Sequence, residues 1–201
     1  MQSSTFATGG YDHNVHLWRL SGYNVSEPPA TLAIRHTAVV QSLLAIRDTS
    51  HKLVTASADC SVNIFDLSSL RVTNTLKVSN SVYHVHPTDS EFTTLLEVAH
   101  RELQFEIRDH RLIPTMPVVR FGYQSAKVHG RYVRGGVHGT VFASGGSDKD
   151  GCVRFWDLRK TTEVVQTVSC LPGRKVTQVA FGNGRWLACS EDHHLAFMNM
   201  I

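Results

Sequence analysis

The chain has 201 residues, of which 42% are hydrophobic and 18% charged, and its formal net charge is +3. This is ordinary globular composition, and the length allows a sizeable core. No apolar run reaches about 18 residues, so we predict no transmembrane helix. The first ten residues, MQSSTFATGG, do not match a secretory signal.

The four cysteines show no C-x-x-C spacing: Cys60, Cys152, Cys170 and Cys189. This favours reduced thiols over a disulfide framework or a zinc ribbon, so we expect an intracellular protein of the nucleus or the cytoplasm. Residues 1–100 carry 6 Lys/Arg and 8 Asp/Glu, or −2, whereas residues 101–201 carry 14 and 9, or +5. A basic second half can favour an acidic partner or nucleic acid. However, no block of five or six basic residues occurs, so a solvated surface with a mild bias is the simpler interpretation.

One phrase recurs along the chain, at residues 6–20, 53–67, 142–160 and 186–200. In each copy an Asp is followed by a branched aliphatic residue three positions later and by a large apolar residue six positions later. The sets are Asp12, Val15 and Trp18; Asp59, Val62 and Phe65; Asp150, Val153 and Trp156; and Asp192, Leu195 and Met198. A decayed copy, LLEVAHRELQFEI, places His100, Leu103 and Glu106 at these positions. The five corresponding positions, four Asp and His100, are separated by 47, 41, 50 and 42 residues, which indicates an internal repeat.

Each repeat is predicted to form about four strands. In the second repeat, Val39–Ile46, Lys52–Ala56, Ser61–Asp66 and Val72–Leu76 are rich in Val, Ile, Leu and Thr. Four strands in roughly 40–45 residues are typical of a propeller blade. No stretch has a helical period, so almost no helix is expected. We therefore predict an all-β fold, a β-propeller of four-stranded antiparallel blades in a single domain over residues 1–201. Its five units are predicted at about 1–34, 35–77, 78–120, 121–169 and 170–201.

The repeat resembles the WD-repeat (WD40) β-propeller family. The resemblance is carried by Trp156-Asp157, by Phe65-Asp66, by the S-x-D of Ser57–Asp59, and by His36, which lies 23 residues before Asp59. It covers nearly the whole chain. It is specific for the fold, but it says little about function.

In the family, a His before the blade, a Ser or Thr on the second strand, an Asp in the following turn and a Trp on the third strand form a buried hydrogen-bonded chain. In the second unit the matching residues are His36, Ser57 and Asp59, with Phe65 at the Trp position. Phe65 has no N–H to donate, so the chain should stop short there.

The other units match the family pattern in part. The matches are Asp12 and Trp18, with Gly10 at the Ser position; Asp150 and Trp156, with Asp148 at the Ser position; and Ser190 and Asp192, with Met198 at the Trp position. Because no unit is complete, we expect an eroded propeller held by apolar packing more than by polar networks. These Asp and His residues are interpreted as structural rather than catalytic.

The resemblance also implies that the propeller is incomplete. Family members usually have seven blades and close by pairing strands from both termini, whereas Thr5–Gly9 matches a second strand and the last residues, LAFMNMI, match a third. We expect part of a longer seven-bladed protein, with pairing to a second chain and closure with five blades as the alternatives. An unclosed propeller would expose apolar faces and strand edges that favour self-association.

The sequence contains no motif for catalysis or for cofactor binding. His84 and His86 share one strand face, and His193 and His194 lie in a turn, but no nearby Cys, Asp or Glu completes a metal site in either pattern. The Gly-rich segments GGYDHN and GGSDKDG match no phosphate-binding loop. We therefore expect no metal, no cofactor and no enzymatic activity.

The family resemblance suggests where a partner would bind. Family members often contact partners through the residue before each turn Asp, here Tyr11, Ala58, Lys149 and Glu191. This mixed set favours a protein or peptide over directly bound nucleic acid. The predicted function is therefore a non-catalytic interaction scaffold or adaptor.

Two alternative functions remain open. The segment WDLR resembles the W-D-x-R box of substrate receptors that dock on the adaptor of cullin-RING ubiquitin ligases, which would use Trp156, Asp157 and Arg159. The basic second half motivates a chromatin-associated propeller.

Overall fold

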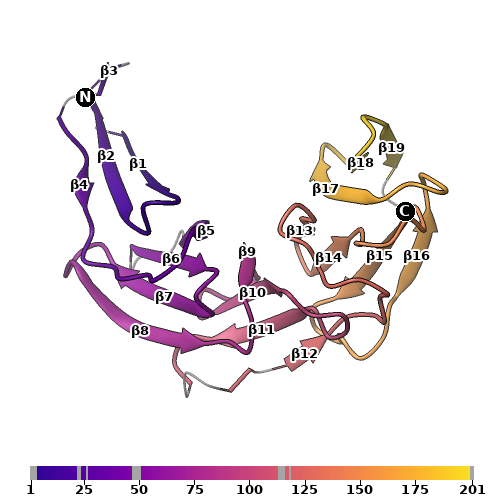
Figure 1. The fold of residues 1–201 in the computed structure, drawn as a ribbon, viewed down its shortest axis with the longest axis horizontal. Coiled ribbons are helices and arrows are strands. Elements are labelled where there is room, and N and C mark those ends of the chain that lie inside the picture. The colour runs from indigo at the N-terminus through magenta and orange to yellow at the C-terminus, as the bar shows by residue number, and fades with distance from the viewer. Residues whose placement is uncertain are drawn as a thin grey trace. The chain divides into compact units, whose positions relative to one another are not determined.

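The computed structural model describes residues 4–21, 24–25, 27–46, 51–112, 116–117 and 119–199. Every regular element among them is a strand, and the strands form antiparallel sheets (Figure 1). The protein therefore has an all-β fold with several four-stranded antiparallel sheets, as the sequence predicted. In this part of the chain no helix is long and apolar enough to cross a membrane.

Five sheets follow one another along the chain. The first contains β1 (Ser4–Gly9), β2 (Val15–Ser21), β3 (Asn24–Val25) and β4 (Ala30–Thr31). The second contains β5 (Val40–Ile46), β6 (Lys52–Ser57), β7 (Ser61–Asp66) and β8 (Arg71–Lys77). The third contains β9 (Val82–Pro87), β10 (Thr93–Val98), β11 (Phe105–Asp109) and β12 (Val119–Phe121).

The fourth sheet contains β13 (Gly136–His138), β14 (Val141–Ser144), β15 (Cys152–Asp157) and β16 (Gln166–Ser169). The fifth contains β17 (Val176–Gly182), β18 (Arg185–Ser190) and β19 (Leu195–Asn199). The last four sheets are meanders in which consecutive strands pair, whereas in the first sheet β3 and β4 both pair with β2.

The chain divides into two compact units. The first comprises the residues up to Val85 with a short segment from His110, and the second comprises His86–Asp109 and the residues from Met116 onward. The division falls within β9. Each unit has its own core.

The repeated Asp belongs to a tight turn between two paired strands of its sheet: β1 and β2 for Asp12, and the second and third strands for Asp59, Asp150 and Asp192. The residue after it has a positive φ in four sheets, at His13 (64°), Cys60 (62°), Gly151 (68°) and His193 (67°). In three of these turns the Asp carboxylate accepts the backbone N–H two residues further on, from Asn14, Ser61 and Cys152, at 3.0–3.2 Å. The Asp thus stabilises a turn that the backbone alone disfavours for non-glycine residues.

The cores are formed by strand residues packed between neighbouring sheets. In the first unit, Val15, Val40, Leu53 and Phe65 lie in one cluster. In the second unit, Trp156 packs edge-on against Phe105, with ring centroids 5.1 Å apart. A second cluster in that unit surrounds Trp186.

Candidate interaction site

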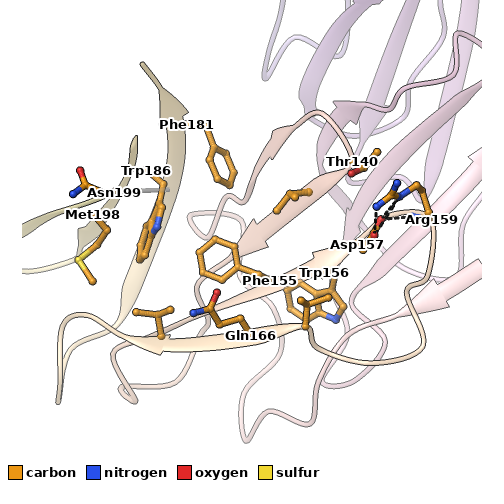
Figure 2. Close-up of a pocket in the computed structure, with 13 residues that line it drawn as sticks. Thr140, Phe155, Trp156, Asp157, Arg159, Gln166, Phe181, Trp186, Met198 and Asn199 are labelled. Atoms are coloured by element: carbon orange, nitrogen blue, oxygen red, sulfur yellow. Dashed lines mark hydrogen bonds and ion pairs between the residues drawn. The ribbon is translucent and has the colours of Figure 1, made fainter. Parts of the chain in front are cut away.

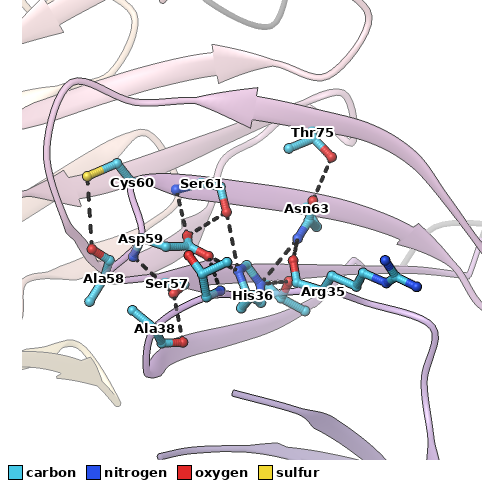
Figure 3. Close-up of polar contacts among 12 residues, drawn as sticks. Arg35, His36, Ala38, Ser57, Ala58, Asp59, Cys60, Ser61, Asn63 and Thr75 are labelled. Atoms are coloured by element: carbon cyan, nitrogen blue, oxygen red, sulfur yellow. Dashed lines mark hydrogen bonds and ion pairs between the residues drawn. The ribbon is translucent and has the colours of Figure 1, made fainter.

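The polar network of the second sheet centres on His36 (Figure 3). His36 Nδ1 lies 3.1 Å from Asp59 Oδ2, and Nε2 lies 2.8 Å from Thr55 Oγ1. Because a carboxylate can only accept, Nδ1 carries the proton and Nε2 accepts from the Thr55 hydroxyl. Burial alone would raise the pKa of Asp59, but hydrogen bonds from Ser61, Thr37 and His36 outweigh it and lower that pKa.

The structure changes the assignment of the hydroxyl in this network. The resemblance pointed to Ser57, but the hydroxyls that lie beside His36 belong to Thr55, two residues earlier on β6, and to Ser61, 3.2 Å from Nδ1. Ser57 Oγ instead accepts the N–H of Asp59 at 3.1 Å and donates to the Ala38 carbonyl. Thr55 and Ser57 lie on the same face of β6, so both hydroxyls belong to this network: Thr55 contacts His36, and Ser57 contacts the turn at Asp59.

The first sheet shows the same displacement of the hydroxyl. Gly10 stands at the position expected for a Ser, but Thr8 supplies the hydroxyl and accepts the Trp18 indole N–H at 2.8 Å. Asp12 is paired with His16, with 2.8 Å between Oδ2 and Nε2. Trp18 therefore has the hydrogen bond that the family pattern implies, with a different partner.

In the fourth sheet, two aspartates, Asp148 and Asp150, make the hydrogen bonds that Asp59 alone makes in the second sheet. Asp148 accepts the Ser125 hydroxyl at 2.8 Å and the Ala126 N–H at 3.2 Å, as Asp59 accepts the Thr37 N–H. Asp150 stabilises the turn and forms an ion pair with Arg154. The longer GSDKDG turn accommodates both carboxylates.

In the fifth sheet Asp192 is held by Ser190 and by Arg174, whose Nε donates to Oδ2 at 2.8 Å. The Ser190 hydroxyl and Arg174 lower the pKa of Asp192 to about 2. Arg174 thus takes the role that His36 has in the second sheet.

The third sheet, where the repeat is most decayed, contains buried charged groups that sequence analysis missed. Glu97 is fully buried; Oε1 lies 2.6 Å from His86 Nε2 and accepts the Gly135 N–H at 2.8 Å, while Oε2 lies 2.7 Å from His129 Nε2. Burial would raise the pKa of Glu97, but the hydrogen bonds from His129 and His86 outweigh it and hold the pKa well below its usual range.

A second buried carboxylate, Glu106, receives Arg108 Nη2 at 2.6 Å and lies 3.0 Å from Arg120 Nε. The third sheet therefore combines buried polar contacts with the apolar packing of Leu95, Phe105 and Phe121. The signal in the sequence was a Glu within each of two otherwise apolar segments, TTLLEVA and LQFEI.

Two expected partner-binding residues lie in each unit. Tyr11 is 73% exposed and Ala58 is partly buried in the first unit. In the second unit Lys149 and Glu191 are exposed and lie 3.6 Å apart as an ion pair. The structure thus brings Lys149 and Glu191 together, and their charges offset each other.

The WDLR segment is divided between core and surface. Trp156 is 1% exposed and is packed in the aromatic core, so its side chain is not placed to contact an adaptor. Asp157 and Arg159 lie at the surface and form a bidentate ion pair. Arg159 Nη2 donates to Asp157 Oδ2 at 2.7 Å, and Arg159 Nε donates to Oδ1 at 2.9 Å. The hydrogen bonds from Arg159 lower the pKa of Asp157 to about 2.

A cavity of about 560 Å³ lies between the fourth and fifth sheets (Figure 2). Phe155 of β15, Trp186 of β18 and Met198 of β19 line it. Asp157 and Arg159 lie at its rim. An apolar cavity of this size with a few polar groups at its mouth is typical of a binding site.

The described residues do not form a metal centre. No group of three or more His, Cys, Asp or Glu among them is placed to hold a metal ion. Of the histidines considered above, His86 is instead paired with Glu97, and His194 Nδ1 lies 3.0 Å from the Asp192 carbonyl oxygen.

Comparison with known proteins relates the fold to designed proteins. No family model matches the sequence, and no curated protein matches it. The crystal structure of the computationally designed Ika8 protein is similar over the whole chain, with a TM-score of 0.71 and 15% identity, and the chain spans 57% of its length. The computationally designed Ika4 protein is similar over 85% of this chain and 96% of its own, with a TM-score of 0.65 and 14% identity. At these identities the likeness shows the fold alone.

Proposed function

We propose that the chain is part of a WD-repeat β-propeller and acts as a non-catalytic interaction scaffold. The propeller assignment is supported by the turn Asp followed by a residue of positive φ in four sheets, and by the His36–Asp59–Thr55 network. The observation that carries the interaction role is the apolar cavity beside β19, whose lining offers packing surface and a charged rim. The two buried carboxylates Glu97 and Glu106 are paired with other side chains, which favours a structural role for them.

The scaffold role is tested by isolating the tagged full chain from cells under mild conditions. Proteins should co-purify in fixed stoichiometry, and the complex should survive moderate salt because its contacts are mainly apolar. The matched control is the double charge swap Lys160→Glu with Glu163→Lys, an exposed ion pair at 3.3 Å outside the expected partner contacts, which should leave apolar contacts intact. Recovery of the chain alone under every condition would contradict the role.

Ubiquitin-ligase adaptor docking is a second candidate, because Arg159 is 73% exposed in its side chain and presents a planar fork at the surface. It rests on Asp157 and Arg159, since Trp156 is buried. Arg159→Ala should then abolish co-purification of the adaptor while leaving other partners bound. Retention of the adaptor by this variant would exclude docking through Arg159.

A further inference from the structure

The loop between β12 and β13, in the second unit, is anchored by buried contacts at several points along it. Near its start, Ser125 donates its hydroxyl to Asp148 Oδ2 at 2.8 Å. In its middle, His129 is 1% exposed and its Nε2 lies 2.7 Å from Glu97 Oε2. At its end, the Gly135 N–H donates to Glu97 Oε1 at 2.8 Å. These contacts fix the backbone, so the exposed side chains of the loop are arranged before a partner binds.

The turn between β10 and β11 lies against this loop. The Arg101 carbonyl accepts the Ser125 N–H at 3.0 Å, and the His100 carbonyl accepts the His129 N–H at 2.9 Å. This is the turn of the decayed repeat, in which His100 stands where the other repeats have Asp. The loop and the turn therefore form one continuous surface.

The exposed side chains of this surface are mainly apolar or basic. Leu103 is 44% exposed, Val128 46% and Tyr132 68%. The Arg131 guanidinium lies over the Tyr132 ring, 4.6 Å from its centroid. We define the aromatic–basic patch by these residues and two further exposed cations: Arg101, Leu103, Lys127, Val128, Arg131 and Tyr132.

The charge of the loop and the turn is positive. Their exposed cations are Arg101, Lys127, Arg131 and Arg134, and their exposed carboxylate is Glu102, which gives +3. Asp148 at the base of the loop reduces this to +2, and its Oδ2 is already engaged by the loop. The local sign agrees with residues 101–201 as a whole, which carry 14 Lys/Arg and 9 Asp/Glu. A positive surface attracts and orients an acidic partner.

The apolar part of the patch favours a protein over a nucleic acid. Tyr and Arg are enriched at the centres of protein interfaces, where exposed apolar side chains pack against the partner. Leu103 and Val128 offer such packing, but they provide no contact for phosphate groups. Three large apolar side chains exposed on one surface also indicate an interaction site.

We propose that the aromatic–basic patch binds an acidic segment of a partner protein. Apolar residues of that segment pack on Leu103, Val128 and Tyr132, and its carboxylates pair with Lys127 and Arg131. The patch rests on the proposed scaffold function. It is separate from the cavity, whose lining includes none of its residues, so the chain can hold two partners at once.

The test begins with phage-displayed random 12-residue peptides selected on the full chain. Selected peptides should combine Asp or Glu with aromatic or aliphatic residues. The tightest peptide is then synthesised and its affinity measured by fluorescence anisotropy. Arg131→Glu should weaken its binding at least tenfold, and Tyr132→Ala at least fivefold. Binding should also weaken severalfold between about 50 and about 300 mM salt, because the contacts are partly ionic.

The matched control is Arg185→Glu, which makes the same charge change at an exposed arginine of the fifth sheet. It should bind the peptide within about twofold of the unchanged chain. Thermal melts of the variants establish that they are folded. Selection of no acidic peptide, or equal losses in Arg131→Glu and Arg185→Glu, would overturn the proposal. So would a peptide whose binding Arg131→Glu leaves unchanged.

Two further measurements separate this site from the alternatives. A DNA duplex that binds more tightly than the peptide, and that Arg131→Glu releases, would replace the acidic protein segment with nucleic acid. If cellular proteins co-purify equally with the Arg131→Glu variant, the patch is wrong while the scaffold function stands. If none co-purify with the unchanged chain, the scaffold function itself fails.

Discussion

Phe155 of β15 and Trp186 of β18 meet edge to face, with ring centroids 5.2 Å apart and ring planes at 72°. They belong to neighbouring sheets and both line the cavity, so this contact joins the sheets and shapes the cavity. An edge-to-face pair is worth about 0.5–1.5 kcal/mol beyond the buried area.

We predict that Trp186→Ala lowers the free energy of unfolding by about 3–5 kcal/mol, because it removes a buried indole and enlarges an existing cavity. Phe197→Ala is the matched control: its side chain is 67% exposed, and the loss should stay within about 0.5 kcal/mol. Denaturant unfolding measures both. Equal losses would mean that the fourth and fifth sheets are not packed through Trp186.

The repeat and its turns could be predicted from the sequence because the turn depends on local residues. The Asp carboxylate accepts the backbone N–H two residues further on, and the residue between them has a positive φ. It did not predict which hydroxyl meets His36. Thr55 and Ser57 point to the same face, and their depth depends on the register between β5 and β6, in which Thr55 lies opposite Leu43. That register has a bulge between Val40 and Ser42, which local sequence does not reveal.

The His36 network should be cooperative. We predict that His36→Ala and Thr55→Val each destabilise the chain, and that a double-mutant cycle gives a coupling energy of about 1 kcal/mol, because each substitution removes a buried hydrogen bond from the other residue. Ser57→Ala combined with His36→Ala is the control pair and should be closer to additive, since those side chains are not hydrogen-bonded to each other. Additivity in both pairs would contradict the assignment of Thr55.

Glu97 should make stability depend on pH. Its pKa in the folded chain is held below the value of about 4.3 expected when unfolded, so its contribution is complete above that value and is lost as pH falls. Glu97→Gln should destabilise the chain by about 3 kcal/mol at pH 7. The difference between the two proteins should shrink as pH falls below about 4.

The titratable groups that interact with Glu97 are His86 on β9, His129 before β13 and the Tyr123 hydroxyl. Burial raises the pKa of the Tyr123 hydroxyl to about 12. Unfolding curves at several pH values test the effect. A difference between the unchanged chain and the Gln variant that is constant down to pH 3.5 would show that Glu97 is not held ionised.

Sequence analysis predicted the third repeat unit but not its buried polar contacts. His86 and His129 lie 11 and 32 positions from Glu97 in the chain, and neither separation follows from the repeat. The cavity was also unpredictable, because its walls come from two sheets and its size depends on how Phe155 and Trp186 pack.

Two substitutions at the turn position should have opposite effects. Cys60→Gly should stabilise the chain by about 0.5–1 kcal/mol, because φ is 62° there and glycine relieves the strain of a side chain. Gly151→Ala should destabilise it by about 2 kcal/mol or more, because φ is 68° and a Cβ would lie 2.0 Å from the Leu171 carbonyl oxygen. Thermal unfolding of the two variants provides the measurement, and the same sign for both would refute the shared turn geometry.

Hydrogen–deuterium exchange on the full chain, free and in its isolated complex, tests the central claim most directly. If the chain is a scaffold that binds a partner at the cavity between the fourth and fifth sheets, the amides of β18 and β19 around Trp186 and Met198 should exchange at least tenfold more slowly in the complex. Unchanged exchange in β19, with protection confined to the turns that carry Tyr11, Ala58, Lys149 and Glu191, would contradict the account and place recognition on those turns.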